Sequence, residues 1–218
     1  ILAAPGGQIW CHSGARPAVA TVSTGQQLFE YDTNMHRMLD AGGTWKQLTP
    51  YLNYTTLSVA THPVTFTGIP STLRVLRITF SAKCAGALVV ENMLMRLNNA
   101  AAGQYLYNRT VQQNTAVVGL LGDQGLNHFP VSMIGGASGN ANLAGSGVID
   151  ILNWNLSGSL APMVKWQSGV YGTSAPNAFN ETGTGTFNDV GPMNRIDFRT
   201  NGGSNFIAGS YFRIEGWE

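Results

Sequence analysis

Apolar and polar residues alternate along most of this chain with a period of two, which is typical of β-strands. In Leu73–Ser81 the alternation places Leu76, Ile78 and Phe80 on one face and mostly polar residues on the other. No segment carries apolar residues at helical spacing over three turns between a cap and a glycine. The pattern therefore predicts an all-β protein in which these three side chains belong to the core.

The alternation is clearest in eight segments, which we expect to be strands. They are Val64–Thr67, Leu73–Ser81, Ala87–Arg96, Gln104–Asn108, Val148–Trp154, Met163–Tyr171, Asn194–Thr200 and Phe206–Trp217. Clusters of Gly, Asn and Pro separate them and supply the turn conformations. This number and spacing of strands favour an antiparallel, jelly-roll-like β-sandwich, with Phe212 and Ile214 of the last strand facing inward.

The segment Gly25–Pro50 has the character of a separate module. Leu28–Asp32 and Thr44–Leu48 are short strands with turn-forming residues between them, which predicts an N-terminal β-hairpin arm. An isolated two-stranded hairpin is marginally stable in water, so its aromatic residues should bury against the next domain or a neighbouring chain. The expected assembly interface consists of Phe29, Tyr31, Trp45 and Leu48. We expect an arm over residues 1–60 and a β-sandwich over 61–218.

The composition makes some classes of binding partner less expected than others. Charged residues make up 11% of the 218 residues, against about 25% in an average soluble protein, and the formal net charge is only +1. No basic run is present, so neither nucleic acid nor an anionic membrane surface is an expected partner. The longest charge-free stretch, Phe129–Ile149, is interrupted by Pro130 and rich in Gly, which argues against membrane insertion. Cys11 and Cys84 are expected to be free thiols.

Residues that could support catalysis are scattered. The six Asp and five Glu occur singly, and Asp150 and Asp197 are expected to point outward or to lie at loop edges. The four histidines lie at no ligand spacing, and Gly183–Asn188 (GTGTFN) reads as a turn with an edge strand because it lacks the residues of a phosphate-binding loop. We therefore expect no catalytic residue, no metal and no cofactor, and we predict that the chain is not an enzyme.

Carbohydrate binding is a more specific functional alternative than catalysis. Trp154, Asn155, Trp166 and Tyr171 combine aromatic rings with amides and hydroxyls, a combination suited to sugar stacking and hydrogen bonding. The other interpretation places these aromatic rings in the core or at a subunit interface. Both faces of VIDILNW are partly apolar, so periodicity leaves the two interpretations open. The solvent exposure of Trp154 and Trp166 distinguishes them.

Both ends of the chain resemble known sequences. Arg16–Pro50 is similar to an element of many tailed-bacteriophage virion proteins, with matching positions at Arg16-Pro17, Gly25-Gln26, Tyr31-Asp32-Thr33-Asn34 and Gly42-Gly43-Thr44-Trp45. Asn205–Glu218 resembles the closing strand of phage β-sandwich modules, although its last two residues depart from the hydrophobic ending of that pattern. Neither motif is catalytic.

The resemblance implies a function in the phage particle. We expect a non-enzymatic structural component of the virion, in a fibre, the tail or a capsid decoration, exposed on the external surface of the particle. It implies assembly with copies of the same chain, as a homotrimer, and with other virion proteins. The alternative is a host-receptor or carbohydrate-binding module of a phage tail or fibre that contacts a host-surface glycan.

Overall fold

The computed structural model is all-β with sheets that are antiparallel except for one strand pair, and the only helical turn in its described residues is η1 (Ser13–Ala15). The structure describes residues 2–3, 9–18, 25–30, 35–39, 41–47, 50–100, 103–114, 116–139, 144–154, 160–171, 178–189 and 192–218. No described helix is long and apolar enough to cross a membrane. The all-β class predicted from the alternation is confirmed.

The chain divides into two compact units. The N-terminal unit comprises residues 1–52 together with 215–218, and the main unit comprises residues 53–214. The division expected from the sequence, at residue 60, assigned the last residues of the chain wholly to the β-sandwich. In the structure residues 215–218 group with the N-terminal unit, so both ends of the chain contribute to it.

The N-terminal unit contains a five-stranded sheet in place of the expected two-stranded hairpin. Its strands follow the order β1 (Leu2–Ala3), β2 (Ile9–Cys11), β3 (Gln27–Glu30), β4 (Met35–Leu39) and β5 (Trp45–Gln47). Strands β2 and β3 are parallel, and the other pairs are antiparallel. Strand β4 lies between the two segments that the sequence paired directly. Its sequence, MHRML, places His and Arg among apolar residues, which hid its alternation.

The main unit is built on two sheets. The larger has the order β11-β10-β15-β14-β13-β8-β17-β6 and the smaller β12-β9-β16-β7. The strand bounds are β6 (Tyr51–Thr56), β7 (Val64–Phe66), β8 (Val75–Ala82), β9 (Val90–Leu97), β10 (Tyr105–Gln113), β11 (Ala116–Leu126), β12 (Phe129–Gly135), β13 (Gly145–Leu152), β14 (Met163–Tyr171), β15 (Ala178–Phe187), β16 (Ile196–Thr200) and β17 (Tyr211–Trp217).

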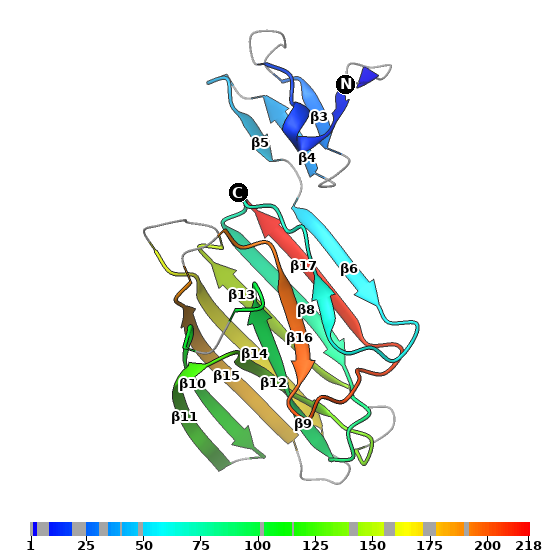
Figure 1. The fold of residues 1–218 in the computed structure, drawn as a ribbon, viewed down its shortest axis with the longest axis vertical. Coiled ribbons are helices and arrows are strands. Elements are labelled where there is room, and N and C mark those ends of the chain that lie inside the picture. The colour runs from blue at the N-terminus through cyan, green and yellow to red at the C-terminus, as the bar shows by residue number, and fades with distance from the viewer. Residues whose placement is uncertain are drawn as a thin grey trace. The chain divides into compact units, whose positions relative to one another are not determined.

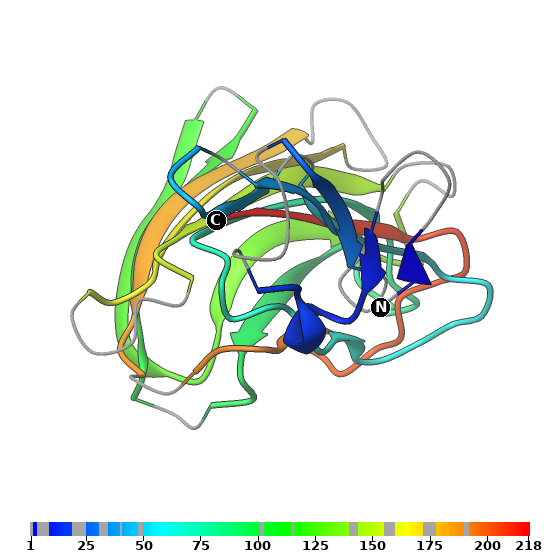
Figure 2. The same ribbon diagram turned by 90° about the horizontal axis from the view of Figure 1, so that it is seen from above.

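The two sheets of the main unit face each other in two layers. Strand β12 of the smaller sheet packs against β13, β14 and β15 of the larger one, and Figure 1 shows β12, β9 and β16 in front of the larger sheet. In Figure 2 the larger sheet curves along one side of the smaller. Each strand thus has an inward and an outward face, as the period of two requires.

The core lies between these layers. Leu76, Ile78, Phe80, Phe212 and Ile214 are all buried, which confirms the inward faces predicted from the alternation. Aromatic rings from both layers meet there, with ring centroids 5.0 Å apart for Phe198 and Phe212, 6.5 Å for Phe80 and Phe212, and 5.4 Å for Phe206 and Phe212.

Strand β15 corrects the interpretation of Gly183–Asn188 as a turn with an edge strand. It is a central strand, paired with β10 on one side and β14 on the other. The indole of Trp166 lies over Gly183, where an added Cβ would be 2.1 Å from Cζ2 of the ring. Glycine is therefore required here by close packing rather than by a turn.

Asp197 corrects a second expectation. Its side chain is fully buried and does not point outward. Arg195 Nε donates to both carboxylate oxygens at 3.0 and 2.9 Å, and the Thr65 hydroxyl donates to Oδ1 at 2.6 Å. These donors replace the water that burial removes. Asp150 is half-buried and pairs with the exposed Arg77 at 2.7 Å.

Candidate functional site

An aromatic row crosses one face of the five-stranded sheet. Trp10 of β2, Phe29 of β3 and His36 of β4 are direct neighbours in register, so their side chains share a face. The ring centroids of Trp10 and Phe29 are 4.7 Å apart, as are those of Phe29 and His36, and both contacts are edge-to-face. Trp10 is 38% exposed, while Phe29 and His36 are half-buried. This aromatic row is therefore an accessible apolar surface.

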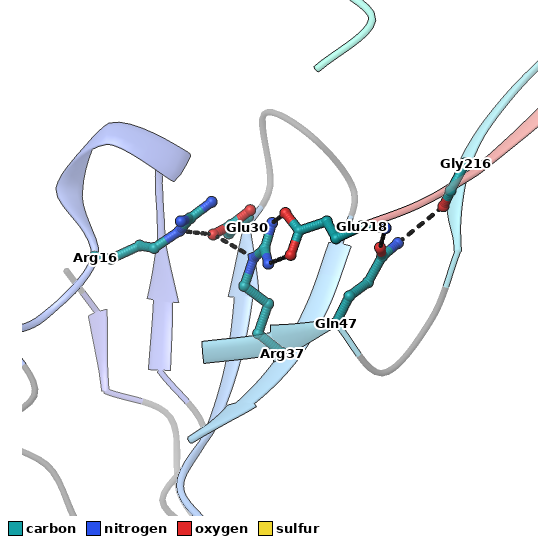
Figure 3. A network of polar contacts seen from close by, with 6 residues as sticks. All are labelled: Arg16, Glu30, Arg37, Gln47, Gly216 and Glu218. Carbon is teal, nitrogen blue, oxygen red and sulfur yellow. Dashed lines mark hydrogen bonds and ion pairs between the residues drawn. The ribbon is translucent and has the colours of Figure 1, made fainter. Parts of the chain in front are cut away.

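The opposite face of the same sheet buries both apolar and charged residues. Leu28 and Leu39 are buried there, together with Glu30 and Arg37, whose exposures are 0% and 1%. Arg37 Nε donates to Glu30 Oε1 at 2.9 Å, and Arg16 contacts the same oxygen (Figure 3). A buried charge is tolerated only when it is paired, and this arrangement pairs the carboxylate with two guanidinium groups.

The C-terminal residues complete this ion network. Both terminal nitrogens of Arg37 donate to the carboxylate of Glu218, in the bidentate geometry seen in Figure 3. Burial by itself would lower the pKa of Arg37, but the hydrogen bond and charge of Glu218 and the charge of Glu30 raise the pKa overall. The guanidinium is therefore held in its charged form between two carboxylates.

Gln47 of β5 fixes the backbone of the same segment. Its side-chain amide donates to the Gly216 carbonyl at 3.0 Å and accepts the Glu218 N–H at 3.0 Å (Figure 3). Backbone and side chain of the last residues are thus both bound to the N-terminal sheet. The face behind the aromatic row is closed by the chain itself.

The structure separates the residues expected at the assembly interface. Phe29 belongs to the aromatic row, whereas Trp45 is paired in register with the buried Leu39 and lies on the opposite face of the sheet. Tyr31 and Leu48 lie outside the described residues. Sequence reasoning did not select Trp10 or His36. No local signal singles them out, because neither IWC nor MHRML alternates clearly between polar and apolar residues.

The expected glycan-binding residues are placed in the main unit. Trp154 and Trp166 have exposures of 0% and 4%, and Trp166 Nε1 donates to Glu181 Oε1 at 3.0 Å inside the core. Neither ring presents a face to solvent, so this placement agrees with the core interpretation. Asn155 and the side chain of Tyr171 lie outside the described residues.

Glu181 of β15 forms a second buried polar cluster, with Trp166 and Arg109. Arg109 Nη1 donates to Glu181 Oε1 at 3.2 Å and to Asn92 Oδ1 at 3.3 Å. Burial raises the pKa of Glu181, although the charge of Arg109 and the hydrogen bond from Trp166 oppose the shift. The cluster joins β10, β14 and β15 on their inner faces to β9 of the other sheet. The hydrogen bond from Arg109 to Asn92 thus connects the two layers through polar side chains.

The His, Cys, Asp and Glu side chains that the structure describes form neither a metal-binding cluster nor a disulfide bond. No group of three or more of these described side chains is arranged to hold a metal ion. Cys11 and Cys84 are both buried, and neither forms a disulfide bond, as the sequence predicted. Cys84 Sγ donates to Glu91 Oε2 at 3.2 Å, and Gly202 N–H donates to the other oxygen of that carboxylate.

The Cys84 thiol is expected to be unreactive in the folded protein. Burial raises its pKa from 9.0 to about 11, so the native state keeps the neutral thiol, and the stability that this provides is lost as the pH rises from about 9 towards 11. In a Cys11→Ser variant, iodoacetamide at pH 8 should label Cys84 only after unfolding in urea. Mass spectrometry reads the labelling, and stoichiometric modification in native buffer would contradict the buried assignment.

A groove of about 550 Å³ lies at the edge of the main unit. It is bordered by β6 and β7, which are the edge strands of the larger and the smaller sheet, and by the segment that joins them. The lining residues are Asn53, Tyr54, Thr55, Leu57, Thr61, Pro63, Val64, Thr65, Phe66 and Thr67. Leu57, Val64 and Phe66 are buried, and the ring of Tyr54 is 64% exposed.

No family model, curated protein or solved structure matches this chain. The functional assignment therefore rests on the sequence resemblance and on the surfaces described above.

Proposed function

We propose that this chain is a non-enzymatic structural component of a tailed-bacteriophage virion that acts through assembly of its own copies. The role would be that of a fibre, tail or capsid-decoration protein on the external surface of the particle. Its partners would be identical chains, in a homotrimer, and other virion proteins. The proposal needs no cofactor, nucleic acid or membrane insertion.

The aromatic row Trp10–Phe29–His36 is the observation that carries the proposal. The sheet behind it is closed by the Arg37 ion network, so the row is the face left available for a partner. Aromatic side chains are enriched at protein interfaces because they bury a large area with few rotatable bonds. A second copy that covers the row would remove these rings from water.

The topology of the main unit adds support for the jelly-roll part of the proposal. The smaller sheet, β7-β16-β9-β12, and the strands β8, β13, β10 and β11 of the larger sheet follow the strand order of a jelly roll, if β14 and β15 extend β13 into a three-stranded meander between β8 and β10. Consecutive strands β7 to β10 alternate between the two sheets, as this fold requires. Jelly rolls are common among viral capsid and lectin domains.

Analytical ultracentrifugation tests the assembly proposal. The native chain should sediment as an oligomer, and the double variant Trp10→Ala with Phe29→Ala should sediment as a monomer whose main unit keeps its thermal transition. Leu160→Ala is the matched control, because Leu160 is 59% exposed but lies in the main unit, and it should leave the oligomer unchanged. A native chain that stays monomeric at every accessible concentration would refute the proposal.

A host-receptor or carbohydrate-binding role is the second candidate function. The observation that favours it is the β6–β7 groove, which combines an exposed tyrosine with hydroxyl and amide groups. Trp154 and Trp166, which the sequence nominated for sugar contact, are not among the described residues that line this groove.

A further inference from the structure

The lining of the β6–β7 groove is uncharged and combines hydrogen-bonding side chains with apolar ones. None of the ten described residues that line it carries a formal charge. Thr55, Thr61, Thr65 and Thr67 contribute hydroxyl groups, Asn53 an amide and Tyr54 a phenol, and the buried Leu57, Val64 and Phe66 also line the groove. The volume lies within the ~300–1,000 Å³ typical of small-molecule sites. A charged ligand would find no counter-ion among these residues.

Two of the threonine hydroxyls have their protons committed to the protein. Thr65 donates to Asp197 at 2.6 Å, and Thr61 donates to the Val59 carbonyl at 3.0 Å. A carbonyl oxygen has no proton to offer, and Asp197 also accepts from Arg195, so each hydroxyl must act as the donor in its bond. The lone pairs of the two threonine oxygens are therefore left to accept from a ligand.

The exposed ring of Tyr54 is the third feature of the groove that suits a sugar. Tyr54 lies on the edge strand β6 and is 64% exposed, more than any other described aromatic side chain. A flat ring beside a neutral groove suits the apolar face of a pyranose, whose hydroxyl groups point outward around its rim. Hydroxyl groups are the donors that the fixed threonine acceptors require.

We infer that the β6–β7 groove binds an uncharged saccharide, with Tyr54 stacking on the sugar ring and Thr61 and Thr65 accepting hydrogen bonds from its hydroxyls. The inference rests on the second candidate function. Its failure and that of the assembly proposal are distinguishable, because the aromatic row and the groove are tested by separate variants and separate measurements.

The test begins with immobilised neutral oligosaccharides of glucose, galactose, mannose and N-acetylglucosamine, with sialylated and sulfated oligosaccharides alongside. The native chain should bind at least one neutral member and no charged member more tightly. Calorimetry with that oligosaccharide should show roughly tenfold weaker binding for Tyr54→Ala and binding within about threefold of native for Tyr54→Phe, which keeps the ring.

Thr65→Val should weaken binding about fivefold, because it removes one acceptor. Thr182→Val is the matched control, since Thr182 is an exposed threonine on β15 outside the groove, and it should bind like the native chain. Thermal melting checks that Thr65→Val folds without its bond to Asp197, and the exposed Tyr54 provides the test if it does not. Absence of neutral binding, binding of charged oligosaccharides alone, or full affinity in Tyr54→Ala would each overturn the inference.

Discussion

Arg37→Met is expected to destabilise the N-terminal unit by about 3 kcal/mol. Removing one partner of a buried ion pair typically costs about 3–5 kcal/mol, because the remaining charge stays buried without compensation. Here Glu30, with 0% exposure, would lose its bond to Arg37 but keep Arg16, which places the expected cost at the lower end of that range. Glu218 would also lose both of its bonds to the guanidinium.

Urea unfolding and amide hydrogen exchange measure this effect. Exchange should accelerate in β3 and β4 of the N-terminal unit, while the strands of the main unit keep their protection. The amide of Glu218 donates to Gln47, and the carboxylate of the same residue is held by Arg37. Without Arg37 this residue is held less firmly, so its amide should also exchange faster.

Arg77→Met is the matched control for Arg37→Met. Arg77 also forms an arginine–carboxylate pair, at 2.7 Å from Asp150, but the two side chains are 51% and 32% exposed. Exposed pairs contribute about 0–1 kcal/mol because water screens them. Equal costs for the two substitutions would show that the burial of Arg37 adds nothing to the stability of the sheet.

Gly183→Ala is expected to destabilise the main unit by about 3 kcal/mol, at the upper end of the range for overpacking a core. The added methyl group would lie 2.1, 2.3 and 2.7 Å from three atoms of the Trp166 indole. That ring cannot easily move away, because it is buried and its N–H donates to Glu181. Urea denaturation monitored by circular dichroism gives the change in the free energy of unfolding.

A double-mutant cycle isolates the contact between Gly183 and Trp166. Trp166→Ala alone should cost about 3–5 kcal/mol, but Gly183→Ala introduced into that background should cost little, since the ring that it would meet is gone. Gly14→Ala is the control, because no atom lies within 4 Å of its added Cβ. A cost below about 0.5 kcal/mol for Gly183→Ala in the native background would mean that the indole relaxes freely.

Local alternation was sufficient to predict the inward residues of the regular strands. Leu76, Ile78 and Phe80 in β8, and Phe212 and Ile214 in β17, are buried as the period of two requires. Met163–Tyr171 is the strand β14 with the bounds that the sequence predicted. In these segments a side chain's face follows from its position in the strand, whichever strand lies beside it.

Strands with irregular patterns were recognised less well, because the environment of their residues is set by packing partners that are remote in sequence. Gly183 resembles a turn residue until Trp166 is placed over it, and Asp197 resembles a surface residue until Thr65 of β7 is placed beside it. Both residues break the local pattern for a reason that lies in another strand.

For the candidate sites too, some features follow from the sequence and others only from the tertiary structure. The sequence by itself determined that this is a weakly charged β protein and that Phe29 belongs to a strand, whereas the unit that contains Gly25–Pro50 also takes in both ends of the chain. Only the tertiary structure decided that Phe29 and Trp45 lie on opposite faces and that Trp154 and Trp166 are buried. The physical reason is that alternation fixes which side of a strand a residue occupies, whereas sheet order and layer packing determine what that side meets.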